Sequence, residues 1–400
     1  MNSFEILKNK KLLIFYFSVF LSNIGSWLQN VALSWLALSI KNASFSFGLI
    51  SFLNSIPSLF FAFIGGYLAD YFNNRRILVV SQSVCLLVAF YLGISVYTNK
   101  ISYIELATLA FISGVGSAIS YPIYYNILIS FVSHDKIPAL IALNSLQFNL
   151  SRFIGPTVFS LLVLITGIGG AFILNGLSYL PFIFVLLTIV FSEKLKSRDN
   201  RNFFTNILSG FKYIVCERKL FDVIKIVLVY SFFVLPYMGM LPYYIKNYVG
   251  DNPQLLGIEL GILGFGSILG SIFITLFPEN YEKLFERILK SGCSFSILLG
   301  LLGVVTNIYF FSLTIFLMGF SMVLFYASAN AFIHLISKED FRGRVASIFT
   351  SVYLGVYPVG VLITGTVAEY ISIKLIFIAQ ATFSIFYVIL IFVNYKFRLY

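Results

Sequence analysis

Long hydrophobic runs separated by short polar intervals dominate this chain of 400 residues. A run of about 20 residues is long enough to cross the ~30 Å hydrocarbon core of a bilayer as a helix. The hydrophobic residues are continuous and do not alternate with polar ones, which excludes an outer-membrane barrel. The pattern predicts twelve transmembrane helices, at 12–40, 47–69, 77–98, 103–129, 139–165, 170–191, 221–245, 255–277, 286–305, 308–335, 344–370 and 374–394.

The longest polar interval, residues 192–220, divides the predicted helices into two sets of six. We therefore expect an N-terminal six-helix bundle at 1–191, a cytoplasmic linker at 192–220 and a C-terminal six-helix bundle at 221–400. Apolar residues recur in the linker at helical spacing, which indicates an amphipathic helix on the membrane surface. These residues are Phe203, Phe204, Ile207, Leu208, Phe211 and Ile214.

The distribution of basic residues indicates the orientation in the membrane. Of the 27 Lys and Arg residues, the predicted topology places 21 on the side of the N-terminus and four on the opposite side. Loops rich in Lys and Arg stay in the cytoplasm, so we expect both termini and the linker there. The net charge of +11 follows from this topology and predicts no nucleic-acid partner.

Composition narrows the class of protein further. The chain is 59% hydrophobic and 11% charged, which no soluble domain of this length could accommodate on its surface. Three scattered cysteines and two histidines provide neither a disulfide framework nor a metal site. No phosphate-binding loop and no cluster of His, Asp or Cys groups stands out, so the sequence predicts no enzyme and no cofactor.

The two predicted bundles contain similar segments. In the fifth helix, Ser145 precedes Pro156 by eleven residues, and Asn149 precedes it by seven. In the eleventh helix, Ser347 and Ser351 stand at the same distances before a proline, Pro358. Repeated six-helix halves that bind substrate at the midplane are typical of one transporter architecture. We therefore expect two pseudo-symmetric bundles.

A charged turn between the second and third predicted helices stands out from its apolar surroundings. Gly66 and Asp70 end one helix, and Arg75 and Arg76 begin the next. Gly66 lets a neighbouring helix approach, and Asp70 can pair with an Arg or cap a helix. The simpler alternative is that the two arginines only set the topology.

Two stripes of polar residues could face a substrate cavity. Asn23, Trp27 and Asn30 share one face of the first helix, where they could line a cavity or hydrogen-bond to a neighbouring helix. Asn149 and Arg152 share a face of the fifth helix. Arg152 could bind an anionic group of a substrate or brace the nearby charged turn. In the second half, Asn330 is the corresponding candidate.

Several motifs resemble those of the major facilitator superfamily. The stretch from Gly66 to Arg76 resembles its signature between the second and third helices, with Asn73 and Asn74 in place of a Gly and an Arg. Within the superfamily, the chain is most similar to the group of macrolide-type drug exporters and enterobactin-type siderophore exporters. The stretches that carry this similarity are 25–36, 142–156, 171–178 and 342–347. The pair Gly155–Pro156 resembles an exporter motif.

The resemblance implies a monomeric secondary transporter in a bacterial cytoplasmic (inner) membrane. It would be an antiporter that exports small amphiphilic molecules (drugs, siderophores or related metabolites) by alternating access, with protons as the coupling ion. The resemblance also implies gating roles for Gly66, Asp70, Arg75, Arg76, Gly155, Pro156, Arg342 and Arg344. A lysophospholipid flippase and a facilitator on the same fold stay open as alternatives.

One departure from the group bears on the coupling ion. Members often carry an acid and an Arg in the fourth helix, where this chain has 120–125 (Ser-Tyr-Pro-Ile-Tyr-Tyr). No carboxylate stands near the middle of any predicted helix. The nearest acids are Glu105, Glu259 and Glu369 near predicted outer ends and Asp70 at an inner one. The sequence itself therefore supports proton coupling poorly.

Overall fold

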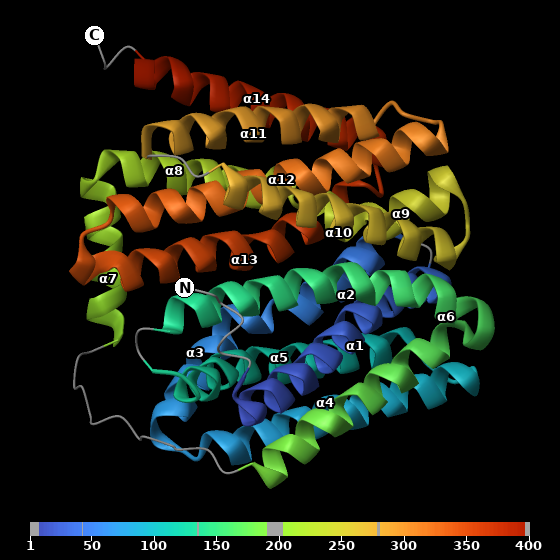
Figure 1. Ribbon diagram of the computed structural model, residues 1–400. Coiled ribbons are helices and arrows are strands. Elements are labelled where there is room, and N and C mark those ends of the chain that lie inside the picture. Colours follow the sequence, from blue (N-terminus) through green and yellow to red (C-terminus); the bar gives the residue numbers. More distant parts are fainter. Residues whose placement is uncertain (1–7, 42, 134–135, 190–202, 278–280, 397–400) are drawn as a thin grey trace. The chain divides into compact units, whose positions relative to one another are not determined.

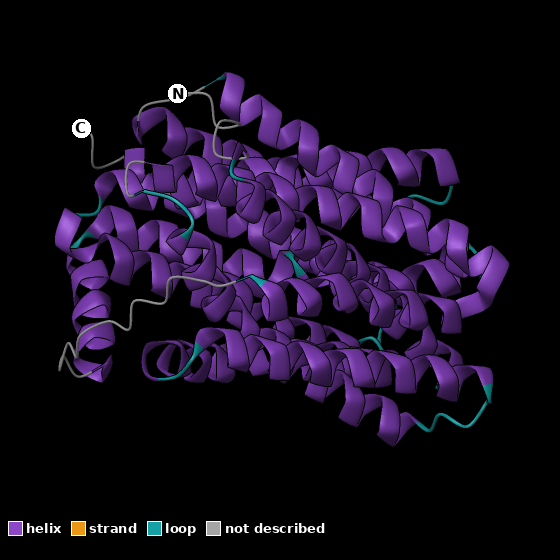
Figure 2. Ribbon diagram, turned by 60° about the horizontal axis from the view of Figure 1, so that its bottom comes forward, coloured by secondary structure: helices purple, strands orange, loops and turns teal. Residues whose placement is uncertain are grey.

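The computed structural model describes residues 8–41, 43–133, 136–189, 203–277 and 281–396 (Figure 1). Within these ranges the chain is helical and contains no strand, as Figure 2 shows. It forms two compact units, one of residues 1–197 with 250–261 and one of residues 198–249 with 262–400. The expected division at 191 and 220 stays a prediction.

The first unit contains the first six helices. Here α1 packs against α6, α3 and α4 each pack against α5, and α4 also contacts α6. The second predicted span, 47–69, corresponds to both α2 and α3, which are separated at Ile56 just before Pro57. The helices are α1 (Lys10–Ile40), α2 (Ser44–Ser55), α3 (Pro57–Tyr71), α4 (Asn74–Tyr97), α5 (Tyr103–Ser130) and α6 (Ile137–Thr188).

The second unit contains the remaining helices, of which α10 begins within residues assigned to the first. In this unit α11 packs against α12 and α14, and α13 packs against η3 and α9. Its elements are α7 (Phe203–Cys216), α8 (Arg218–Val229), η3 (Tyr230–Val234), α9 (Pro236–Tyr244), η4 (Ile245–Val249), α10 (Pro253–Leu276), α11 (Tyr281–Leu302), α12 (Ile308–Ile336), η5 (Glu339–Phe341), α13 (Arg342–Val367) and α14 (Ile373–Lys396).

The described helices match the twelve predicted spans. Among the described residues, ten stretches are long and apolar enough to cross a membrane. One of them, Ala139–Thr188, holds two predicted spans that meet at Gly167, whose φ of 65° is a backbone conformation that a β-carbon disfavours. The stretch α11 is not among the ten because its first turns are strongly charged. Counting both parts of α6 and adding α11 gives twelve, so the prediction of an all-α polytopic membrane protein is confirmed.

Side-chain caps explain where several helices begin. Asn9 accepts a hydrogen bond from the Lys11 amide at 3.1 Å, and Asn307 accepts one from the Tyr309 amide at 2.9 Å. Ser102 and Glu105 form a reciprocal capping box at the start of α5. Each cap satisfies amide groups that the helix leaves unpaired. Polar residues in the intervals between hydrophobic runs therefore determine where these helices begin.

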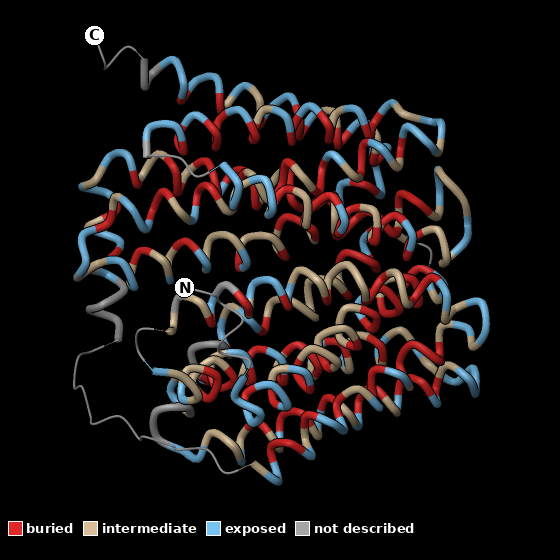
Figure 3. The backbone as a smooth tube through the Cα atoms, in the orientation of Figure 1, coloured by how far each residue is buried: buried red, intermediate tan, exposed pale blue. Residues whose placement is uncertain are grey.

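The outer helices expose large apolar side chains on one side. On α4, Leu87 is 65% exposed, and on α14, Phe386 is 64% exposed. Figure 3 shows that exposed positions line the outer side of α14 while buried ones line the opposite side. A soluble protein could not tolerate such surfaces, whereas a bilayer covers them. The chain is a multi-pass membrane protein.

The ninth predicted span, 286–305, begins too late. The structure begins α11 at Tyr281, so Lys283 belongs to the helix together with Arg287 and Lys290. The exposed side chains of Glu286 and Lys290 form an ion pair of 2.9 Å one turn apart, which supports a charged helical start. Hydropathy alone could not find this start because it scores these charges as loop.

Candidate functional site

A buried polar network joins α1 to the second half of α6. The amide of Asn175, which is fully buried, donates to the Gln29 Oε1 atom at 2.7 Å and lies 3.4 Å from the Tyr179 hydroxyl. The Ser26 hydroxyl lies 3.4 Å from the same Tyr179 oxygen. Burying polar groups is costly unless they are hydrogen-bonded. The network therefore favours one register of α1 against α6.

Two glycines bring the backbones of α1 and α6 together. A β-carbon at Gly155 would lie 2.5 Å from the Trp27 Cβ atom and 2.9 Å from the Ile24 carbonyl oxygen. A β-carbon at Gly25 would overlap the side chains of Ser178 and Asn175. Such close approach through small residues is a common way for membrane helices to associate. Pro156, which follows Gly155, is buried in the same region.

A polar cavity of about 140 Å³ adjoins the network. The Asn54 side chain lines the cavity, and its amide donates a hydrogen bond to the Asn30 Oδ1 atom at 3.2 Å. Because about 10–15 Å³ of such volume is enough for one water, the cavity has room for several waters or for a polar group of a larger molecule. The residues that line it come from α1, α2, α5 and α6: Ser26, Gln29, Asn30, Asn54, Ser113, Gly114, Ser117 and Tyr179.

A cation and two aromatic rings lie on the neighbouring turns of the same helices. The guanidinium carbon of Arg152 lies 5.6 Å from the centre of the Trp27 ring. The Phe148 ring meets Trp27 edge-on, with the ring centres 5.7 Å apart. A cation over an indole face contributes about 0.5–2 kcal/mol. The contact holds Arg152 in place, and the partly exposed group combines a positive charge with apolar surface.

The other residues of the two predicted stripes have separate surroundings. Asn149 donates to the carbonyl of Ser145 in its own helix at 2.9 Å. Asn23 is partly buried on α1, and Asn330 is exposed on α12 in the second unit. The structure thus brings Trp27 to Arg152 and Asn30 to Asn54, but it gives Asn149 a local role.

The predicted charged turn lies between α3 and α4. Gly66 and Asp70 fall within α3, but the structure does not describe their surroundings. The Arg75 guanidinium donates to the carbonyl of Leu187 near the end of α6. The backbone of Asn73 is extended, with φ −67° and ψ 108°. Its side chain caps α4 by accepting a hydrogen bond from the Arg76 amide at 2.9 Å. Asn therefore serves here as a helix cap, and the turn needs no left-handed residue.

The predicted gating arginines of the second unit lie at the start of α13. Arg344 donates to the Ser209 hydroxyl of α7 at 2.9 Å, and its guanidinium carbon lies 5.0 Å from the centre of the Phe341 ring. The Tyr213 ring of α7 stacks on Phe341 with the ring centres 4.4 Å apart. Arg342 is exposed. Arg344 therefore holds α7 against the segment between α12 and α13.

Comparison with known proteins identifies the family. Residues 1–400 match the major facilitator family described as transmembrane secretion effector. The chain belongs to this family. It is 22% identical over 363 residues to the staphyloferrin A transporter of Staphylococcus aureus, with 90% of each chain covered. It is 21% identical over 373 residues to macrolide efflux protein A of Streptococcus pyogenes, again with 90% of each chain covered.

A solved structure confirms the fold of this transmembrane secretion effector. The crystal structure of the nucleoside transporter NupG superposes with a TM-score of 0.73 at 14% sequence identity, covering 96% of this chain and 99% of that one. The prediction of a major facilitator fold is confirmed, and with it the resemblance to drug and siderophore exporters. The protein is a transporter and not an enzyme.

Sequence reasoning missed part of the site. Gln29 and Asn175 were visible only as members of the stretches 25–36 and 171–178, which carry the family resemblance, and Tyr179 and Asn54 carried no signal of their own. An amide in the middle of an apolar run is the signal that could have found Asn175, because such a group needs a partner in the membrane. Its partner could not be found, since Gln29 is 146 residues away.

Proposed function

We propose that this protein exports a small amphiphilic molecule, such as a drug, a siderophore or a related metabolite, by alternating access. The cavity lined by Asn30 and Asn54 is the observation that carries the proposal, because it offers uncharged hydrogen-bond donors and acceptors inside a membrane domain. The aromatic and cationic group at Trp27 and Arg152 would take an apolar or anionic part of the same molecule. The name of one relative, macrolide efflux protein A, supports export.

The proposed orientation follows from the distribution of basic residues. Both termini lie in the cytoplasm of a bacterial cell, and the protein acts as a monomer in the cytoplasmic membrane. The turn at Asp70, Arg75 and Arg76 closes one side in one of the alternating states. Gly155 and Pro156 provide the close packing about which α1 and α6 move, and Arg342 and Arg344 act at the start of α13.

Proton coupling, which the family resemblance implies, needs a group that binds and releases a proton. Among the described residues, Glu259 on α10 is the carboxylate that is almost fully buried, at 1% exposed. Glu105 is partly exposed and is held by the Ser102 cap and by the Tyr91 hydroxyl at 3.2 Å. We propose Glu259 as the proton-carrying group, because an ionisable side chain buried in a membrane helix is often functional.

A substitution in the cavity tests the export proposal. Asn54→Leu removes the amide that bonds to Asn30 and fills polar space with an apolar side chain. We expect a fluorescent amphiphile to bind the purified variant at least about tenfold more weakly, because a buried hydrogen bond to ligand is lost and its partner stays unpaired. Asn247→Leu, at an exposed amide in the second unit, is the matched control. Equal binding by both variants would remove the cavity from the substrate site.

A lysophospholipid flippase is the second candidate, and Arg152 favours it. The guanidinium beside two aromatic rings could hold a phosphate while the rings contact an acyl chain. Transfer of a labelled lysophospholipid across a liposome bilayer, lost on Arg152→Ala, would support the flippase. Efflux of a soluble drug or siderophore without lipid transfer would support the exporter.

A further inference from the structure

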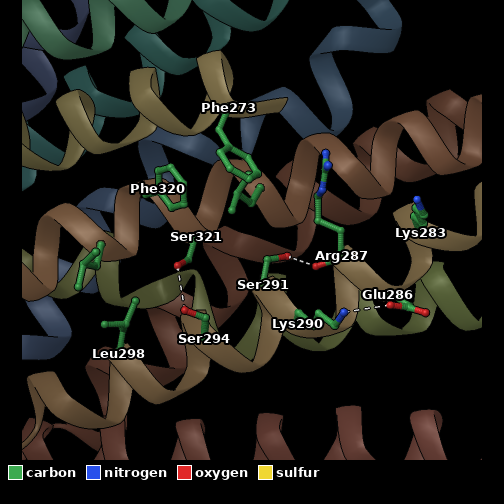
Figure 4. A pocket seen from close by; sticks show the side chains of 12 residues that line it. Phe273, Lys283, Glu286, Arg287, Lys290, Ser291, Ser294, Leu298, Phe320 and Ser321 are labelled. Atoms are coloured by element: carbon green, nitrogen blue, oxygen red, sulfur yellow. Dashed lines mark hydrogen bonds and ion pairs between the residues drawn. The ribbon is translucent and has the colours of Figure 1, made fainter. Parts of the chain in front are cut away.

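A cavity in the second unit is lined by none of the residues of the site described above. Its volume is about 700 Å³, and α10, α11 and α12 surround it. Figure 4 shows the charged side chains on α11 and the rings of Phe273 and Phe320 on the facing helices. The lining residues are Phe273, Lys283, Glu286, Arg287, Lys290, Ser291, Ser294, Leu298, Leu317, Phe320, Ser321 and Leu324.

The lining changes in polarity along α11. Lys283, Arg287 and Lys290 occupy its first turns, the hydroxyls of Ser291 and Ser294 follow, and Leu298 comes last. A helix rises 1.5 Å per residue, so this gradient extends over about 22 Å. One leaflet contributes about half of the ~30 Å hydrocarbon core. The cavity therefore changes from charged to apolar over the depth at which a phospholipid does the same.

The charged end of the cavity is positive and partly fixed. Three cations line it against one carboxylate, Glu286. Arg287 is only 8% exposed, and its Nη2 atom donates to the Phe277 carbonyl at 2.7 Å. Its guanidinium carbon lies 5.7 Å from the centre of the Phe273 ring. These contacts hold one cation at the wall of the cavity. Lys283 and Lys290 are exposed, and Lys290 pairs with Glu286 at 2.9 Å.

The apolar wall of the cavity begins beside Arg287. The Phe273 ring, which contacts the Arg287 guanidinium, packs edge to face with Phe320, with the ring centres 5.8 Å apart. Leu317 is 38% exposed, and Leu298 forms part of the inner wall. Between the two ends, the Ser294 and Ser321 hydroxyls lie 3.2 Å apart and can bond to an ester group. Contact of this apolar surface with an acyl chain is more favourable than its contact with water.

We propose that this cavity binds one anionic phospholipid of the leaflet at the start of α11. The phosphate lies among Lys283, Arg287 and Lys290, the glycerol region contacts Ser291 and Ser294, and an acyl chain runs past Leu298 and Leu317. Basic pockets between membrane helices on the cytoplasmic side are suited to such headgroups. The leaflet is the cytoplasmic one under the predicted topology. This lipid stays bound to the second unit and is not the transported molecule.

Titration of lipid into the purified full chain, followed by native mass spectrometry, tests the proposal. We compare phosphatidylglycerol, phosphatidylcholine and inorganic phosphate as probes. We expect phosphatidylglycerol to bind at least about tenfold more tightly than phosphatidylcholine. The double variant Lys283→Gln, Lys290→Gln should lose this preference by about tenfold or more, because each basic residue adds to the affinity for an anionic headgroup.

The control variants distinguish a built site from general attraction. Lys212→Gln removes an exposed cation of α7 and should leave lipid binding unchanged. Ser294→Trp fills the middle of the cavity and should weaken binding of phosphatidylglycerol without changing any charge. These variants avoid the buried Arg287, whose loss could prevent folding. Equal affinity for the two lipids, an unchanged double variant, or inorganic phosphate that competes fully would overturn the proposal.

Discussion

At the scale of single residues, the site depends on amide side chains that satisfy one another inside the membrane domain. Asn175 bonds to Gln29 across two helices, and Asn54 bonds to Asn30. The first pair is buried and the second borders the cavity. We therefore assign the first pair mainly to stability and the second mainly to the substrate.

Replacing Asn175 should destabilise the protein. Asn175→Leu removes the donor to Gln29 and leaves a buried acceptor without that partner, at a cost of about 1–3 kcal/mol. The apparent melting temperature of the purified protein in detergent measures this change. Asn330→Leu, at an exposed position, should change stability by less than about 0.5 kcal/mol. A melting temperature equal to that of the native protein would contradict the structural role of Asn175.

Replacing Gly155 should separate α1 from α6. A methyl group in Gly155→Ala meets backbone and Cβ atoms of α1 that cannot move aside cheaply, and overpacking of this kind costs about 1–3 kcal/mol. Gly343→Ala is the matched control, because a β-carbon there meets no atom within 4 Å. We expect a lower melting temperature for the first variant only. Two variants of equal stability would show that the two helices are not held by this contact.

At the scale of elements, the amphipathic pattern of α7 predicted a helix correctly but did not show what it touches. Ile214 is buried, whereas Leu208 and Phe211 are 68% and 55% exposed. Tyr213, which the pattern did not single out, stacks on Phe341, and Arg344 donates to Ser209. Contacts between residues more than a hundred positions apart cannot be read from spacing along one chain.

The contacts of α7 lead to a prediction about its local stability. Tyr213→Ala removes the stack on Phe341, which is worth about 0.5–1.5 kcal/mol beyond burial. We expect amide hydrogen exchange in residues 208–216 to become about three- to tenfold faster, with little change in α12. Arg342→Ala removes an exposed cation beside the same contact and should leave the exchange of α7 unchanged. Equal exchange in native protein and Tyr213→Ala would mean that α7 is held elsewhere.

Hydropathy predicted almost every helix, because crossing a bilayer requires continuous apolar length. It failed at the start of α11, where charged residues lie within the helix. It also missed the pairing of Gln29 with Asn175, since a polar side chain in an apolar run shows the need for a partner but not which one. The candidate site could therefore be predicted as single polar residues, of which Trp27, Arg152 and Asn30 found partners in the structure.

At the scale of the whole molecule, the proposed transport depends on a proton gradient, with Glu259 as the proposed proton carrier. Glu259→Gln keeps the size of the side chain but cannot release a proton. We expect the variant to lose acceleration of efflux by an imposed pH gradient, while exchange of substrate without a gradient continues. Glu105→Gln should keep its gradient response, because Gln can replace Glu in a capping box. A gradient response that survives in Glu259→Gln would exclude this carboxyl group as the carrier.

Efflux of an amphiphile from proteoliposomes tests the central claim most directly. Liposomes that contain the native protein or Asn54→Leu are loaded with a fluorescent macrolide-like or siderophore-like compound, and its release is followed with and without a pH gradient. We predict release by the native protein that the gradient accelerates and that Asn54→Leu reduces at least about tenfold. Equal release by the two proteins would contradict this claim. So would a lack of release of either compound while lysophospholipid crosses the bilayer.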